Sequence, residues 1–201
     1  MGSHILAGVT LITATSDSLL AGLSDTSDQT AWQAYVERYR PLLWRYGRRF
    51  GLGAAEAEDF CQDTLLAFAE GYRAGRYDRA RGRLRSWLFG IARNVALKHL
   101  QRTPLEGAER SRWLERAAGE DPFAALWEKE WRLAVLRACL GEIEREVEPQ
   151  TFRAFCLFAR EGRAAAEVAA ELDMTENAVF CARQRIVRRV RELLPSVEAV
   201  F

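Results

Sequence analysis

Polar side chains recur at helical spacing close to the C-terminus, within residues 164–193. The segment 173–175 fits a short turn between two helices, and Val179 and Ile186 fall on the inward face of the second helix. Outward amide and guanidinium groups suit the DNA major groove, because arginine pairs with guanine and asparagine or glutamine with adenine. The pattern therefore predicts a helix-turn-helix, with a solvated basic surface helix as the alternative. The outward residues are Asn177, Phe180, Cys181, Gln184, Arg185 and Arg188.

A second group of cations lies in the arginine-rich segment 73–83 and in the helical pattern that follows it, 84–101. Glycines in the first segment predict a loop. Tyr77, Trp87 and Phe89 lie among these arginines. Cations and aromatic planes together suit single-stranded nucleic acid, where phosphates meet the charges and unstacked bases meet the rings. Trp87 and Phe89 also fit the buried side of a helix, and we interpret them as core residues.

Acidic and amide side chains form a third group, in the segment 56–70. Glu56, Asp59, Gln62 and Asp63 recur at helical spacing and give one polar stripe on an otherwise basic region. The stripe is either a solvated helix face or a docking site for a partner helix. Carboxylates at this spacing could hold a metal, but no histidine and no glycine-rich phosphate loop accompany them. We therefore expect no catalytic residue, no metal and no cofactor.

Helical periodicity runs through most of the chain, and strand patterns are nearly absent. We therefore predict an all-α protein of two small helical domains joined by a flexible linker. The expected domains are 16–102 and 124–201, with a linker at 103–123 and an N-terminal extension at 1–15. The expected helices are 18–23, 28–50 (kinked or divided at Pro41), 54–72, 84–101, 112–118, 124–146, 150–160, 164–172 and 176–193.

Charge and composition support this division. The net charge is only +1, yet residues 31–102 hold 14 basic against 7 acidic side chains, which is the asymmetry that binding to a polyanion needs. No apolar run approaches the roughly 20 residues of a membrane span, so we expect a cytoplasmic protein. The 4 cysteines lack the spacing of a metal site, and we interpret them as small buried side chains.

Three blocks in this order resemble the extracytoplasmic-function (ECF) group of RNA polymerase sigma factors. They are AEDFCQDTLLAFAEGY, YDRARGRLRSWLFGIARNVAL and AAEVAAELDMTENAVFCARQRIVRRVREL. The resemblance covers roughly Ser16 to Leu194. It implies sigma region 2 in the first domain and region 4, with the helix-turn-helix, in the second. It also implies a non-enzymatic protein that directs promoter recognition, DNA melting and transcription initiation.

The resemblance also implies partners and roles. The partners are core RNA polymerase, through its β′ clamp helices and β flap, promoter DNA as duplex and melted strand, and an anti-sigma factor. The implied polymerase contacts are Asp59, Gln62 and Asp63. The implied −10 contacts are Arg76, Tyr77, Arg79, Arg81, Arg83, Arg85, Arg93, Asn94 and Lys98. The implied −35 contacts are Thr175, Asn177, Phe180, Cys181, Gln184, Arg185 and Arg188.

Three other functions compete with this one. A helix-turn-helix regulator that never joins polymerase explains residues 164–193 but gives the block 54–101 no role. A nuclease would use Glu56, Asp59 and Asp63. A helical adaptor leaves the two basic surfaces unexplained.

Overall fold

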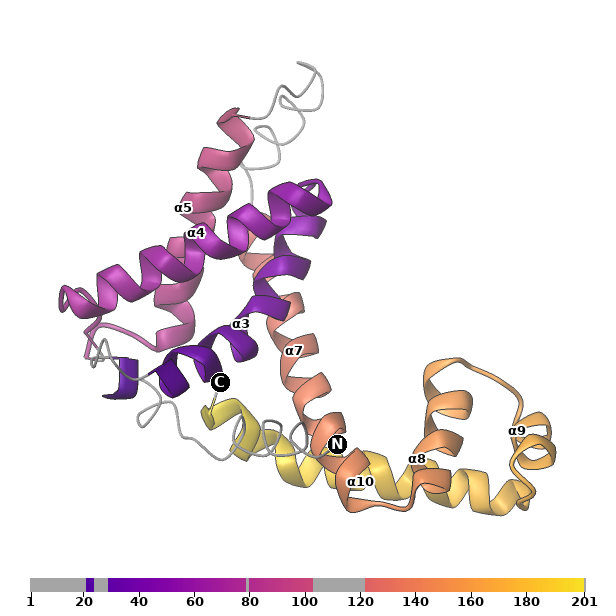
Figure 1. Cartoon of the computed structure of the whole chain (residues 1–201). Helices are drawn as coiled ribbons and strands as arrows, with labels where there is room; N and C mark the ends of the chain where they lie inside the picture. Colours follow the sequence, from indigo (N-terminus) through magenta and orange to yellow (C-terminus); the bar gives the residue numbers. More distant parts are fainter. Residues whose placement is uncertain (1–20, 24–28, 79, 103–121, 201) are drawn as a thin grey trace, which may run out of the picture. The chain divides into compact units, whose positions relative to one another are not determined.

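The computed structural model describes residues 21–23, 29–78, 80–102 and 122–200. All regular structure in these residues is helical, as predicted, and it falls into two compact units, residues 1–134 and 135–201 (Figure 1). Among the described helices, none is long and apolar enough to cross a membrane. The expected helices at 18–20 and 112–118, the extension 1–15 and nearly all of the linker 103–123 lie outside the described residues.

Three helices form the frame of the first unit: α3 (Gln29–Arg49), α4 (Ala54–Arg73) and α5 (Leu84–Arg102). Helix α3 continues through Pro41 as a single element, so the sequence was right to allow a helix there but wrong to allow a division. Its side chains at three- and four-residue steps are buried, and they pack largely on α4. The fully buried rings and chains include Tyr35, Tyr39, Leu42, Leu43, Tyr46, Phe60 and Phe68.

The start of helix α7 (Pro122–Glu146) completes the core of the first unit. Phe123, Trp127 and Trp131, four residues apart, are each no more than 3% exposed. A buried aromatic side chain removes about 150–250 Å² from water, so at about 25 cal/mol per Å² three of them contribute on the order of 10 kcal/mol as an upper bound. Residues 122–134 are therefore a structural part of this unit.

The second unit contains the rest of α7, α8 (Pro149–Phe155), a single π-helical turn η1 (Cys156–Arg160), α9 (Ala165–Glu171) and α10 (Glu176–Val200). Pro149 begins α8, where a missing N–H costs nothing. The predicted helix at 150–160 is thus divided into an α-helix and a π-turn. Small side chains fill the core between α9 and α10, among them Ala154, Val168, Ala169, Val179 and Ala182.

Two details differ from the sequence analysis. Leu66 lies in the helical pattern 54–72 and, as an apolar residue, is expected in the core, but 55% of its surface is exposed. Cys61 and Cys139 are buried as expected, but Cys156 is half-buried and Cys181 is exposed. Both differences arise because the type of a residue alone does not show whether it lies on the buried or the exposed face of its helix.

Candidate nucleic-acid and polymerase interfaces

The polar stripe lies on the outer face of α4. Asp59, Gln62 and Asp63 are exposed, while Phe60 and Leu65 on the opposite face are buried. Leu66 follows Asp59 by seven residues, so it continues the same face by two helical turns. The sequence analysis missed Leu66 as a surface residue. The face therefore combines carboxylates, an amide and one exposed apolar side chain, which is a composition suited to a protein partner.

His99 of α5 holds the end of this stripe. Its Nε2 lies 2.9 Å from Oδ2 of Asp63, and its side chain is only 11% exposed. The ring meets Phe60 edge-on at 6.2 Å. A half-buried imidazole thus holds the Asp63 carboxylate against α5, and no sequence pattern indicated this pairing.

The carboxylates of α4 do not gather as a nuclease would require. Glu56 is used locally: the backbone N–H of Gly53 donates to its Oε2 at 2.7 Å and begins the helix. Within the described ranges, no group of three histidine, cysteine or acidic side chains could hold a metal ion.

The basic loop follows α4. Gly75, with φ of 68°, makes the left-handed turn out of the helix, and the N–H of Arg76 donates to the carbonyl of Gly71 at 3.0 Å. Asp78 orders the tip by accepting the N–H of Ala80 on its Oδ1 at 2.8 Å. The guanidinium-bearing residues Arg76, Arg81 and Arg83 are exposed, and Arg79 lies outside the described residues.

Aromatic rings connect this loop to α5. Tyr77 lies 5.2 Å from Trp87 and 6.3 Å from Tyr72, measured between ring centroids. Trp87 lies 4.8 Å from the buried Phe68. Gly71 permits this approach, because a Cβ there would stand 3.1 Å from the Trp87 ring. The loop therefore packs on the core through these rings. Trp87, interpreted from the sequence as a core residue, is only half-buried.

The loop and α5 together line a groove of about 270 Å³. Arg76 comes from the loop, and Trp87, Asn94 and Lys98 come from α5. Asn94 and Lys98 are exposed. The structure thus brings three of the predicted −10 residues together with one planar ring. The described lining of the groove contains no acidic side chain.

A different face of α5 is covered by α7. Arg85, Phe89 and Arg93, four residues apart, meet Trp131, Trp127 and Phe123 in antiparallel order. The guanidinium carbons of Arg85 and Arg93 lie 5.1 and 5.5 Å from the centres of the Trp131 and Phe123 rings, and the Phe89 and Trp127 rings lie 5.7 Å apart. Both arginines are half-buried rather than outward-facing as expected.

Ion pairs reinforce this contact. Arg85 Nη2 pairs with Oε2 of Glu128 on α7. Arg49 of α3 pairs with Glu130, whose carboxylate is fully buried. Removing the partner of a buried charge is costly, so α7 is fixed to both α3 and α5.

The second unit contains the predicted helix-turn-helix in α9 and α10. Thr175 begins α10 by accepting the N–H of Ala178 on its Oγ1 at 3.2 Å. Asp173, with φ of 50°, makes the turn. Gln150 Nε2 donates to the carbonyl of Leu172 at 2.6 Å and ties α8 to the end of α9. Each predicted outward residue is exposed: Asn177, Phe180, Cys181, Gln184, Arg185 and Arg188.

Two of the side chains on α10 have structural roles. The ring of Phe180, 42% exposed, meets Phe158 edge-on at 5.3 Å. Arg189 forms a bidentate ion pair with Glu146, from Nε to Oε2 at 2.7 Å and from Nη2 to Oε1 at 3.0 Å. The hydrogen bonds from Arg189 lower the pKa of Glu146. Arg189 therefore holds α10 on α7 and is not part of the outward stripe.

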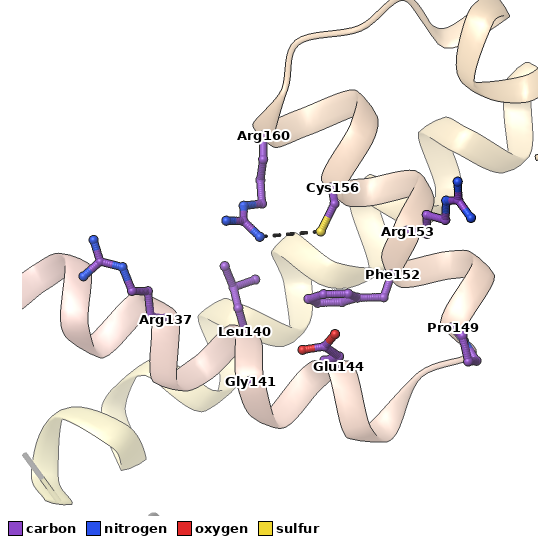
Figure 2. Close-up of a pocket in the computed structure, with 9 residues that line it drawn as sticks. All are labelled: Arg137, Leu140, Gly141, Glu144, Pro149, Phe152, Arg153, Cys156 and Arg160. Atoms are coloured by element: carbon purple, nitrogen blue, oxygen red, sulfur yellow. Dashed lines mark hydrogen bonds between the residues drawn. The ribbon is translucent and has the colours of Figure 1, made fainter. Parts of the chain in front are cut away.

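A groove of about 590 Å³ lies between α7, α8 and η1 in this unit. Figure 2 shows Leu140 and Phe152 on its apolar side and Arg160 above them, with the guanidinium 3.6 Å from Sγ of Cys156. Arg137 and Glu144 also line it. An apolar floor with charged edges is typical of a groove that receives a helix.

The chain is similar to several known proteins. The sigma-70 region 2 family matches residues 35–104, which includes all of α4 and α5. The ECF RNA polymerase sigma factor SigL of Mycobacterium tuberculosis, from strains H37Rv and Erdman alike, is 28% identical over 167 residues, or 79% of this chain and 86% of SigL. A solved structure of CnrH in complex with the cytosolic domain of CnrY aligns over 90% of this chain and 97% of that one, at 23% identity and a TM-score of 0.37. Together, the region 2 match and the similarity to SigL support an ECF-type RNA polymerase sigma factor.

Proposed function

We propose that this sigma factor directs transcription initiation through a polymerase-docking face on α4, a −10 groove between the loop and α5, and a −35 helix, α10. The domain limits 16–102 and 124–201 remain part of this proposal, with residues 122–134 serving the first unit structurally. One observation carries the proposal: a cationic groove with an aromatic wall is lined by α4, the loop and α5, and the acidic docking face lies on the same helix α4.

The docking face binds polymerase. Asp59, Gln62 and Asp63 supply the polar contacts to the β′ clamp helices, and Leu66 adds apolar area at the end of the stripe. Its support is exposure and composition: all four side chains face solvent on one side of α4. Interface positions of this kind cost more than about 1 kcal/mol when truncated at a hot spot, which corresponds to about fivefold in Kd.

The −10 groove captures an unstacked base of the melted strand. Trp87 and Tyr77 offer ring surface, Asn94 offers an amide for a base edge, and Arg76 and Lys98 offer charge to the adjoining phosphates. Arg81 and Arg83 extend the charge along the loop. Extruding a base costs a few kcal/mol, and the polymerase contacts offset that cost by fixing the protein on the promoter.

The helix α10 reads the −35 duplex. Asn177, Gln184 and Arg185 have side chains that can pair with base edges, and Arg188 can meet a phosphate. Each domain alone makes few contacts, so the two act as one bivalent reader when polymerase holds them. The groove between α7, α8 and η1 is our candidate for the β flap contact, and an anti-sigma factor would compete for either polymerase surface.

Run-off transcription with core polymerase and a genomic fragment library tests the proposal. The wild-type chain should give discrete transcripts, and Gln62→Ala and Asp63→Ala should weaken binding to core polymerase at least fivefold without lowering the melting temperature by more than a few degrees. Glu37→Gln, an exposed acid on α3, is the matched control and should bind normally. A wild-type chain that yields no transcript from any fragment, or that binds a promoter tightly without polymerase, refutes the proposal.

A further inference from the structure

Arg85 has two possible partners, an acidic side chain of α7 and a phosphate of promoter DNA. It lies on α5, the helix that carries the −10 groove, yet in the structure its Nη2 pairs with the carboxylate of Glu128. Its guanidinium also rests 5.1 Å from the ring of Trp131. A carboxylate and a phosphate offer a guanidinium the same paired oxygen acceptors. The Glu128 carboxylate therefore takes up the guanidinium N–H groups of Arg85 that a DNA phosphate would otherwise bind.

Two kinds of opening could expose Arg85 to DNA. Moving α7 away would expose three buried rings and break the Arg49–Glu130 pair, so it would unfold much of the first unit. Opening the Arg85–Glu128 pair alone disturbs only partly exposed side chains, 28% and 44% accessible. Pairs of this exposure are individually weak. Only the ion pair, and not the helix, decides whether Arg85 is available.

The opposite side of α5 shows the contrast. Asn94 and Lys98 are exposed and line the groove, and no contact of theirs with α7 is seen in the described residues. Arg93 shares the covered side with Arg85, since its guanidinium faces Phe123. The helix thus has one face that meets α7 and another that faces solvent.

We propose that Glu128 withholds Arg85 from promoter DNA, so that a single acidic side chain of α7 sets how many phosphates the −10 surface engages. Glu128 is a positioning residue, and its effect on DNA passes through Arg85. The inference rests on the proposed −10 role of α5. It goes beyond that role because it removes Arg85 from the direct contacts and assigns a DNA-related task to α7.

The test measures how promoter affinity of the preformed holoenzyme depends on salt, using a promoter fragment recovered by run-off transcription. Each phosphate contact adds about 0.9 to the slope of log K against log salt. Glu128→Gln should steepen the slope by about that amount and raise affinity at low salt. Arg85→Met should leave the slope unchanged, and the double variant should restore the wild-type slope, because the gain requires the guanidinium.

Two controls complete the design. Glu58→Gln removes an acid that pairs with Arg40 at comparable exposure, 53% and 40%, and should not change the slope, which excludes a general effect of net charge. Lys98→Met should reduce the slope by about 0.9. An unchanged slope in Glu128→Gln, or a reduced slope in Arg85→Met, overturns the proposal while wild-type transcription still supports the proposed function. Absence of wild-type binding refutes the proposed function instead.

Discussion

Replacing Trp127 by alanine should destabilise the first unit more than any change to the residues proposed to contact DNA. The side chain is 2% exposed and lies at the centre of the α7 stripe, 5.4 Å from Tyr46 and 5.7 Å from Phe89 between ring centroids. Truncating a buried tryptophan to alanine typically costs about 3–5 kcal/mol. For a unit of this size each kcal/mol lowers the melting temperature by about 3–4 °C.

Tryptophan fluorescence measures this cost for one unit alone. All 6 tryptophans and all 5 tyrosines of the chain precede residue 135, so the second unit contributes no tryptophan emission. Denaturant unfolding followed at the indole emission should show the midpoint of Trp127→Ala shifted by the full 3–5 kcal/mol or so.

The control for this change lies on the same helix. Lys129 is exposed, and Lys129→Ala should stay within about 0.5 kcal/mol of the wild type. A loss of less than about 1 kcal/mol in Trp127→Ala would show that α7 is not part of the first unit, and the account of Arg85 would fail with it.

Three further outcomes are expected. Arg189 lowers the pKa of Glu146 from its ordinary value of 4.5. The pair therefore stabilises the second unit above pH 4.5, and this stabilisation is lost as the pH falls further. In Glu146→Gln, acid unfolding followed by circular dichroism should lack this pH-dependent contribution. Burial raises the pKa of the Cys61 thiol to about 12. A thiol reagent should therefore modify the exposed Cys181 in the native protein and reach Cys61 only after unfolding, which peptide mass mapping would detect. Labelling of Cys61 in the native protein would contradict the packing of α4. Arg185→Ala should cost about 1–3 kcal/mol in promoter binding and relax the preference at one −35 position, and a uniform loss over all −35 sequences would make Arg185 a phosphate contact.

The helices could be predicted because their signals are local. Apolar residues at three- and four-residue steps predicted α3, α4 and α5 to within two residues, and the turn at 173–175 predicted the start of α10. These patterns depend on the chain near each residue, so no knowledge of distant partners was needed. The resemblance to sigma factors, and hence the three surfaces, rested on the same local blocks.

The pairing of α5 with α7 could not be predicted, because its signal is not an amphipathic face. Phe123, Trp127 and Trp131 are separated by four residues, and each such step overshoots a helical turn by about 40°. The three residues therefore span only about 80° of the α7 surface, and the α5 residues that they cover, Arg85, Phe89 and Arg93, are mostly charged. Arg85 and Arg93 then looked outward from the sequence, because the residues that cover them come from beyond residue 121.

Counting charges overestimates the DNA surface for the same reason. The net charge of +7 over residues 31–102 includes arginines that the fold uses itself: Arg40 pairs with Glu58, Arg49 with Glu130, and Arg85 with Glu128. Among the described residues, the exposed cations of the proposed −10 site are Arg76, Arg81, Arg83 and Lys98. At about 0.9 per phosphate, these four predict a contribution of about 3.6 to the salt slope, whereas the net charge would predict about 6. Because a slope counts the ions that DNA displaces, it distinguishes charges that face the promoter from charges that hold α7 in place.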